Sequence, residues 1–267
     1  MSKSNKPKPA IKTDKQKEAG NELVLSFLTL RNLIGISGMA LPIVLTIFTP
    51  KGEEDKVIEH SISEYYYTKN GDLLVVLLSV IGVFLLTYKG YNLFWERTLT
   101  FVAALSGIGV AFFPTAAKIG NSMTIHIVNE KVPMFFGVIQ WHFVFAALFF
   151  ISLALISLFY FSRTNKKDGA QTDAKRRKQK SRRNLIYKFC GWTMLICVLL
   201  MILYIKIDPP SLKNVPVIFI LETVAVEAFG ISWITKGQTL LPDGEHYVIK
   251  GLREAKEMIQ QGTTTPE

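Results

Sequence analysis

The chain has 267 residues, of which 49% are hydrophobic and only 19% charged, and its mean hydropathy is +0.27. This balance excludes an ordinary water-soluble domain and predicts an integral membrane protein. The net charge of +10 does not predict nucleic-acid binding, because the basic residues are confined to polar segments between apolar runs. We therefore expect membrane lipids as partners, with no nucleic acid and no cofactor.

The N-terminal segment 1–21 is polar, lysine-rich and without an apolar period, which predicts a disordered cytoplasmic tail. The first apolar run follows at 23–48 and is long enough to cross a membrane, with a kink expected at Pro42. Arg31 is the exception within this run. It must lie either at the membrane boundary or beside an anion.

Five further apolar runs predict five more spans. The second and third are short, at 72–88 and 98–113, and Pro114 stops the third. The fourth, fifth and sixth are expected at 137–161, 185–205 and 216–236. The segment 237–267 is polar again and predicts a cytoplasmic tail with a hairpin and an amphipathic helix. The fold class is therefore all-α, with a six-helix transmembrane domain over 22–236.

The distribution of lysine and arginine predicts the orientation of these spans. If the N-terminus lies inside, the inner segments carry twenty-two basic residues and the outer loops carry six. Such an excess in short inner loops is the usual determinant of topology. We therefore expect a multi-pass protein of a bacterial cytoplasmic membrane with both termini inside.

Two carboxylates, Glu222 and Glu227, lie in the sixth apolar run, where an ionisable side chain needs polar partners on other helices. Five positions correspond to roughly 140° around a helix, so the two should serve separate neighbourhoods. Counted from the cytoplasmic ends of their helices, Arg31 and Glu227 have the same depth. This predicts a structural ion pair between them, with a gating or proton-relay role as the alternative.

A second group of polar residues falls in the outer half of the membrane under this topology. The second, fourth and sixth spans each contribute one of them, and the motif SISEYYYT at 61–68 enters the second span from the same side. The motif can therefore fold over the group and close a polar cavity. The expected members of this site are Ser61, Ser63, Glu64, Asp72, His142 and Glu222.

Several functions remain open for this group. It can bind a lipid headgroup or small amphiphile, or it can serve a membrane hydrolase in which His142 and Glu222 are metal ligands or an acid–base pair. Alternatively, His142 hydrogen-bonds Glu222 only to fix helix packing. No HxxxH or HExxH motif supports a metal site. A transporter or channel is a further class, but Pro42 is the only helix break that the sequence indicates.

A basic run precedes the fifth apolar segment and has two interpretations. It can attract anionic lipids of the inner leaflet, at about 1 kcal/mol per basic residue, or act only as a topology determinant. Its members are Lys175, Arg176, Arg177, Lys178, Lys180, Arg182 and Arg183.

Elsewhere, the glycines of IGISGMA and SGIGV predict close helix contacts rather than a channel lining.

Seven stretches together resemble a family of bacterial six-span integral membrane proteins, and they extend over about residues 30–237. They are LRNLIGISGMALP, SISEYYYT, VIGVFLLTYKGY, IGVAFFPT, HFVFAALFF, RNLIYKFCG and AFGISWITKG. The pattern is also similar to the wider Frag1/DRAM-type group of membrane proteins. The nearer resemblance implies a six-span bundle without an activity, and the wider one implies lipid handling or membrane trafficking. By that analogy the recurrent polar residues of the group correspond to Ser61, Ser63, Glu64, His142 and Glu222.

Overall fold

The computed structural model describes residues 14–48, 58–88, 94–115, 134–136, 139–163, 174–212 and 215–237. This part of the chain is mostly helical and contains six α-helices. Their bounds are α1 Asp14–Phe48, α2 Gly71–Thr87, α3 Phe94–Phe112, α4 Trp141–Leu155, α5 Ala174–Ile207 and α6 Val217–Lys236. The shorter elements are the 3₁₀-helices η1 Ser63–Tyr67 and η4 Pro210–Leu212, the π-helical turn η2 Ile156–Tyr160 that continues α4, and the strands β1 Met134–Phe135 and β2 Ile139–Gln140.

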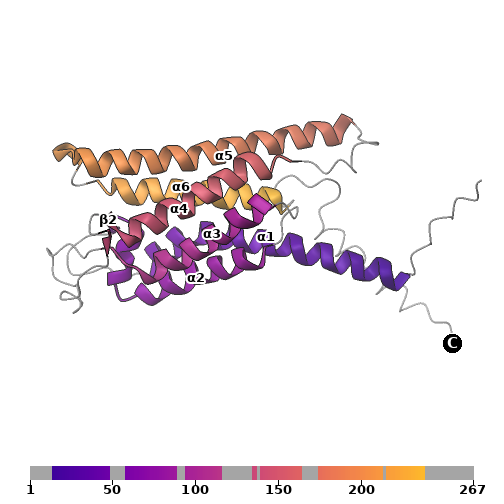
Figure 1. Cartoon of the computed structure of the whole chain (residues 1–267), viewed down its shortest axis with the longest axis horizontal. Helices are drawn as coiled ribbons and strands as arrows, with labels where there is room; N and C mark the ends of the chain where they lie inside the picture. Colours follow the sequence, from indigo (N-terminus) through magenta and orange to yellow (C-terminus); the bar gives the residue numbers. More distant parts are fainter. Residues whose placement is uncertain are drawn as a thin grey trace, which may run out of the picture.

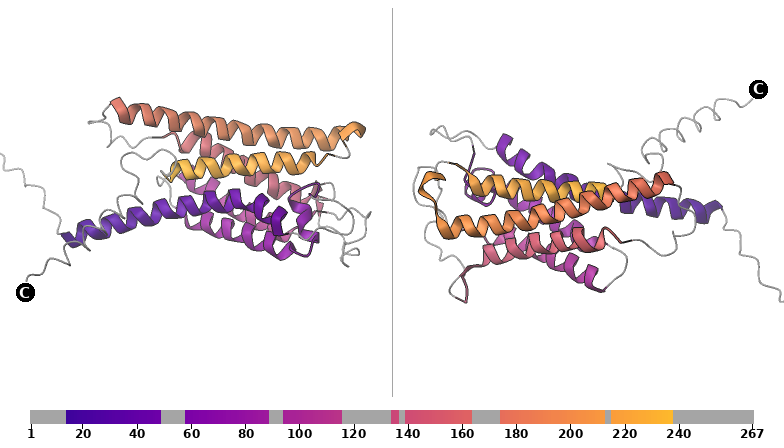
Figure 2. Two further views of the ribbon diagram at one scale, coloured as in Figure 1. Left: turned by 180° about the vertical axis from the view of Figure 1, so that it is seen from behind. Right: turned by 90° about the horizontal axis from the view of Figure 1, so that it is seen from above.

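The helices form a closed ring in which each contacts its neighbours in the sequence. Helix α6 completes the ring by packing against α1 as well as α5. Their axes run roughly along the long dimension of the molecule, and the beginnings of α1 and α5 project beyond the bundle at the same end (Figures 1 and 2). Helices that alternate in direction bring every second loop to the same end of the bundle. The loop before α2 and the start of α4 consequently meet at the end away from these projections.

Four helical segments are long and apolar enough to cross a membrane, which supports membrane insertion. They are Leu28–Phe48, Trp141–Tyr160, Lys178–Ile207 and Val217–Lys236. Helix α2 is also apolar but shorter, and α3 includes the charged residues Glu96 and Arg97 in its first turn. Numerous large apolar side chains point outward from these helices, as expected for a surface that faces lipid tails.

Helices α1 and α5 begin well before the residues that the sequence predicted, and α3 begins four residues early, at Phe94. Helix α1 begins at Asp14, so residues 14–21 are helical where disorder was expected, and α5 begins at Ala174 rather than at 185. Both extensions consist largely of Lys, Arg, Gln, Glu and Ala, which have high helix propensity, and each adjoins a helix that is already nucleated in the bundle. Helix α4, by contrast, begins at Trp141, because residues 139–140 pair with 134–135 as a two-stranded sheet. The C-terminal hairpin and amphipathic helix fall beyond Gly237, outside the described residues.

The close packing of α1 on α6 depends on facing glycines, as the IGISGMA motif predicted. A Cβ atom on Gly35 would lie 2.8 Å from the carbonyl oxygen of Gly230. A Cβ atom on Gly230 would lie 2.8 Å from the carbonyl oxygen of Gly35. Real Cβ atoms do not approach a backbone oxygen this closely, so the two helices meet at this depth only because both residues lack a side chain. This contact sets the register of α1 against α6.

Candidate functional site

The loop between α1 and α2 closes the end of the bundle away from the projecting helices. We call residues Ile58–Asn70 the capping loop. It is tied to the ends of two helices: Asn70 Nδ2 donates to the carbonyl oxygen of Phe48 in α1, and the Tyr67 hydroxyl donates to that of Thr115 after α3. The carbonyl oxygen of Phe48, the last residue of α1, has no intrahelical partner, and the bond from Asn70 satisfies it. The loop is therefore a packed element rather than a free connection.

Helix α6 holds the capping loop through three contacts. The backbone N–H of Ile62 donates to Glu222 Oε2 at 2.6 Å, and the N–H of Phe219 donates to the carbonyl oxygen of His60 at 2.8 Å. The ring of Tyr65 lies against that of Phe219, with their centroids 6.0 Å apart. Glu222 thus has a polar partner, as a carboxyl group in an apolar helix requires, but that partner is the backbone of a loop and not another helix.

His142, in the first turn of α4, holds the next residue of the loop. Its Nδ1 lies 2.7 Å from the carbonyl oxygen of Phe113, and its Nε2 lies 2.8 Å from Ser63 Oγ. Because a carbonyl oxygen can only accept, Nδ1 carries the proton, and in the neutral ring Nε2 accepts from the serine hydroxyl. The imidazole therefore links α3, α4 and the capping loop in one hydrogen-bonded chain.

The sequence of the loop also stabilises its own fold. Ser61 Oγ accepts from the N–H of Glu64, and Glu64 Oε2 accepts from the N–H of His60, both at 3.1 Å. This reciprocal pattern is close to a capping box, in which a serine and a glutamate three residues later satisfy backbone donors at the start of a helix. It starts the 3₁₀-helix η1, which presents Ser63 toward His142.

The structure brings together five of the six residues expected in the site. Ser61, Ser63 and Glu64 lie in the capping loop, and His142 and Glu222 contact it from α4 and α6. Asp72 does not join them. It is exposed in the first turn of α2, where a carboxylate stabilises the positive end of the helix dipole.

His142 and Glu222 do not bond each other, contrary to the simple packing interpretation and to a direct acid–base pair. Each bonds a different residue of the capping loop, Ser63 and Ile62 respectively. Within the described ranges, no group of three or more His, Cys, Asp and Glu side chains is placed to hold a metal ion. The arrangement is thus a polar loop that two helices hold from opposite sides.

The electrostatics of the site are set by two carboxyl groups. Glu64 and Glu222 lie close enough to interact electrostatically. Each uses Oε2 to accept from a loop N–H, and neither Oε1 has a hydrogen-bond partner among the described residues. Two neighbouring carboxyl groups, each with one oxygen that lacks a partner among the described residues, can accept hydrogen bonds from a ligand that carries N–H or O–H donors.

Tyr67 gives the capping loop a testable dependence on pH. Burial, and to a lesser extent the neighbouring Tyr66, raise the pKa of the Tyr67 phenol above its ordinary value of 10.0. The stabilisation from this group is therefore complete below pH 10 and is lost as the pH rises through the folded-state pKa. Tyr67→Phe should cost about 1 kcal/mol of unfolding free energy at pH 8, through loss of the bond to Thr115, and less at high pH.

This difference can be measured by denaturant titration of both proteins in detergent micelles between pH 8 and pH 12. A constant difference across that range would contradict the burial of the Tyr67 hydroxyl.

The predicted pair of Arg31 and Glu227 is not formed. Asn32 packs against Gly237 and Gly38 packs against Phe229, so Arg31 lies level with the end of α6, about three turns or ~15 Å from the level of Glu227. The prediction took residue 23, where the apolar run begins, as the cytoplasmic end of the helix, whereas α1 begins at Asp14 and its first turns project beyond the bundle (Figure 1). The Arg31 guanidinium instead lies 5.5 Å from the centre of the Tyr88 ring, as a cation–π contact.

The sequence did not indicate two charged residues that are buried at the other end of the bundle. Glu96 at the start of α3 is 0% exposed, and Lys236 at the end of α6 is also buried. Lys236 Nζ donates to the carbonyl oxygen of Phe161 at 3.1 Å and lies 5.3 Å from the centre of its ring. The sequence prediction gave Glu96 no role and treated Lys236 only as a basic residue at the cytoplasmic end of the sixth span.

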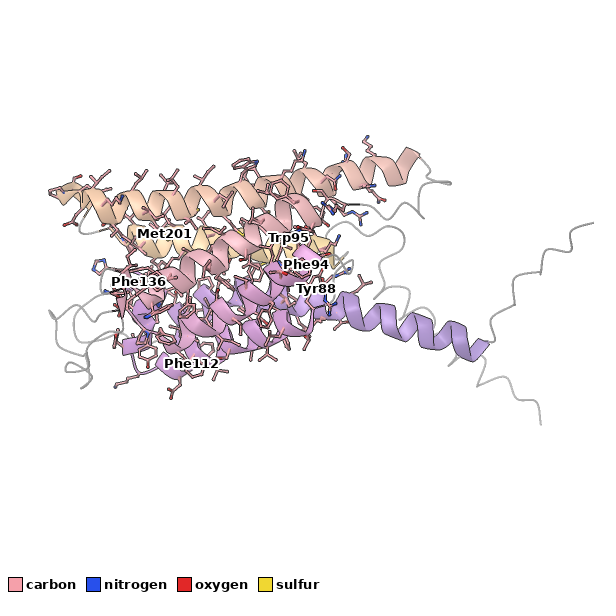
Figure 3. All side chains as sticks on the ribbon, in the orientation of Figure 1. Tyr88, Phe94, Trp95, Phe112, Phe136 and Met201 are labelled. Atoms are coloured by element: carbon pink, nitrogen blue, oxygen red, sulfur yellow. The ribbon has the colours of Figure 1, made fainter. Side chains whose placement is uncertain are left out.

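Exposed aromatic residues mark both ends of the bundle. Figure 3 shows Phe94 and Trp95 near the end from which α1 projects, and Phe136 near the opposite end. Aromatic side chains at two levels are typical of the two interfaces of a membrane. The capping loop lies at the same end as Phe136, because Ser63 contacts the first turn of α4.

Comparison of the chain with models of protein families, with curated proteins and with solved structures finds no match in any of the three. The class that the fold defines is an α-helical membrane-type bundle with a loop-capped polar end.

Proposed function

We propose that the chain is a six-span protein of a bacterial cytoplasmic membrane, with both termini in the cytoplasm. Helices α2 and α3 have 17 and 19 residues, or roughly 26 and 28 Å, which is close to the ~30 Å of a bilayer core. The excess of basic residues supports the orientation, since they are concentrated at the end from which α1 and α5 project. In this orientation the capping loop faces the outer leaflet.

At that end we propose that the protein binds a lipid or small amphiphile with an amine-bearing headgroup, between the capping loop, α4 and α6. One observation carries this proposal: Glu222 bonds the loop with one oxygen, while its other oxygen and that of Glu64 lack partners among the described residues. An ammonium group has donors for such oxygens, and its positive charge would favour the ionised form of the two neighbouring carboxyl groups. Exposed apolar side chains at this end, such as Phe143 next to His142, suit the acyl chain.

Native mass spectrometry of the purified protein tests this function. The wild type should retain a lipid with an amine in its headgroup, and Glu222→Gln should lose most of it. The glutamine can still accept from Ile62 N–H through its amide oxygen, so the loop anchor survives while the carboxylate is removed. Asp72→Asn is the matched control, because Asp72 is exposed outside the site and its loss should leave the bound lipid unchanged. Equal lipid content in all three proteins would contradict the proposal.

The basic run before the fifth span has a separate proposed role in binding anionic inner-leaflet lipids. Helix α5 has 34 residues, or about 51 Å, and exceeds the bilayer core by several turns. Its first turns carry the run of Lys175 to Arg183 as one continuous helix. A cationic helix in that position attracts anionic headgroups, although the same charges also suffice to fix topology.

A further inference from the structure

Ser63 and His142 differ from the other polar contacts within the bundle in one chemical respect. Two buried helix serines, Ser157 and Ser232, donate to backbone carbonyl oxygens at 2.9 and 2.8 Å, which satisfies the hydroxyl and leaves it inert. The Ser63 hydroxyl instead lies 2.8 Å from an imidazole nitrogen. A serine in this position has a base that can take its proton, which is the requirement for a serine nucleophile.

The other side of the imidazole is held as such a pair requires. The Phe113 carbonyl oxygen, 2.7 Å from Nδ1, fixes the tautomer in which Nε2 is the free base directed at Ser63. Phe113 can offer this oxygen because α3 ends at Phe112 and Pro114 has no N–H to continue the helix. Nucleophile, base and orienting acceptor thus come from the capping loop, α4 and the end of α3.

From this geometry we infer that Ser63 and His142 form a nucleophile–base pair that cleaves a carboxylic ester of a membrane amphiphile. The inference rests on the proposed function for its substrate, because Ser63 directly follows Ile62, the residue that bonds Glu222. A headgroup bound at Glu222 would therefore bring the adjoining ester linkage to the serine. Ser63 is 7% exposed, so the capping loop must open to admit the ester and then close over it.

The chemistry proceeds in two balanced steps. Ser63 Oγ forms a bond to the ester carbonyl carbon while its proton passes to His142 Nε2; the carbon–oxygen bond to the alcohol then breaks, and the alcohol leaves with that proton. Water next attacks the acyl-serine, gives its proton to Nε2, and releases the carboxylic acid as the proton returns to Ser63. The overall reaction consumes one ester and one water and yields one acid and one alcohol.

Covalent labelling of the full chain in detergent micelles tests the pair. An alkyl fluorophosphonate should phosphonylate Ser63 with loss of fluoride, and tandem mass spectrometry of the wild type should locate the adduct on Ser63 and not on Ser61. Ser61 is the internal control, because it has the same 7% exposure in the same loop but accepts from a backbone N–H. Mapping the adduct in the wild type requires no variant to fold.

His142→Gln separates base catalysis from positioning. A glutamine amide can still hydrogen-bond Ser63 and Phe113 but has no basic nitrogen, so labelling of Ser63 should slow by about 100-fold or more. Absence of an adduct on Ser63 in the wild type, or equal labelling rates in the two proteins, would overturn the inference. If the protein retains lipid in a Glu222-dependent manner but Ser63 is not labelled, the role of Ser63 as a nucleophile is contradicted and the proposed lipid binding is not.

Discussion

Replacement of His142 by leucine is expected to lower the free energy of unfolding by ~2–5 kcal/mol. The apolar side chain is similar in size, but it removes partners from the Ser63 hydroxyl and the Phe113 carbonyl oxygen together. His142 is only 3% exposed, so water cannot easily replace those bonds. Each buried polar group left without a partner costs ~1–3 kcal/mol. The loss can be measured by denaturant titration in micelles.

A double-mutant cycle separates this loss from a general packing defect. In the Ser63→Ala background, His142→Leu no longer leaves a hydroxyl without a partner. The double variant should therefore lose ~1–2 kcal/mol less unfolding free energy than the sum of the losses in the two single variants. Ser61→Ala combined with His142→Leu is the matched control, because Ser61 bonds Glu64 rather than the histidine, and it should be nearly additive. Additivity in the Ser63 cycle would contradict the hydrogen bond.

The second large effect is expected at Glu222. Glu222→Met keeps the length of the side chain but leaves the Ile62 N–H without its 2.6 Å acceptor, which should cost ~2–3 kcal/mol and loosen the capping loop. Glu222→Gln retains an acceptor and should cost about 1 kcal/mol. Glu227→Gln on the same helix is the control. Glu227 is half-buried with no hydrogen bond in the described chain, so its change should lie within ~0.5 kcal/mol. Similar losses at both glutamates would contradict the anchoring role.

The sequence allowed the helices and the placement of His142 and Glu222 at the same end of the bundle to be predicted, for identifiable reasons. Apolar runs of membrane length are strong signals, and alternating helix directions place the starts of the second, fourth and sixth spans together. The SISEYYYT motif was correctly expected to cover this end. The actual partners, Ile62 N–H and the Phe113 carbonyl oxygen, could not be predicted. Every residue except proline carries both a backbone N–H and a carbonyl oxygen. The amino-acid sequence therefore does not indicate which of these backbone groups a side chain will bond.

The wrong sequence predictions concern how deep a residue lies in the bundle and which way its side chain faces around the helix. Asp72 was placed at the correct end but on the wrong side of α2, since the start of a helix does not fix which way its first turn faces. Arg31 was placed too deep because the polar extension of α1 is helical and hides where the bundle ends. The burial of Glu96 had no local signal. Its burial depends on helices distant in sequence, and charge alone favoured a solvated loop.

The central claim is that the capping loop is held to the bundle from two sides, by Glu222 of α6 and by His142 of α4. Hydrogen–deuterium exchange at the Ile62 amide, resolved to single residues by mass spectrometry, measures this directly. We predict slow exchange in the wild type and at least ~10-fold faster exchange in both Glu222→Met and His142→Leu, since each releases one side of the loop. An Ile62 amide that exchanges equally fast in all three proteins would contradict the account.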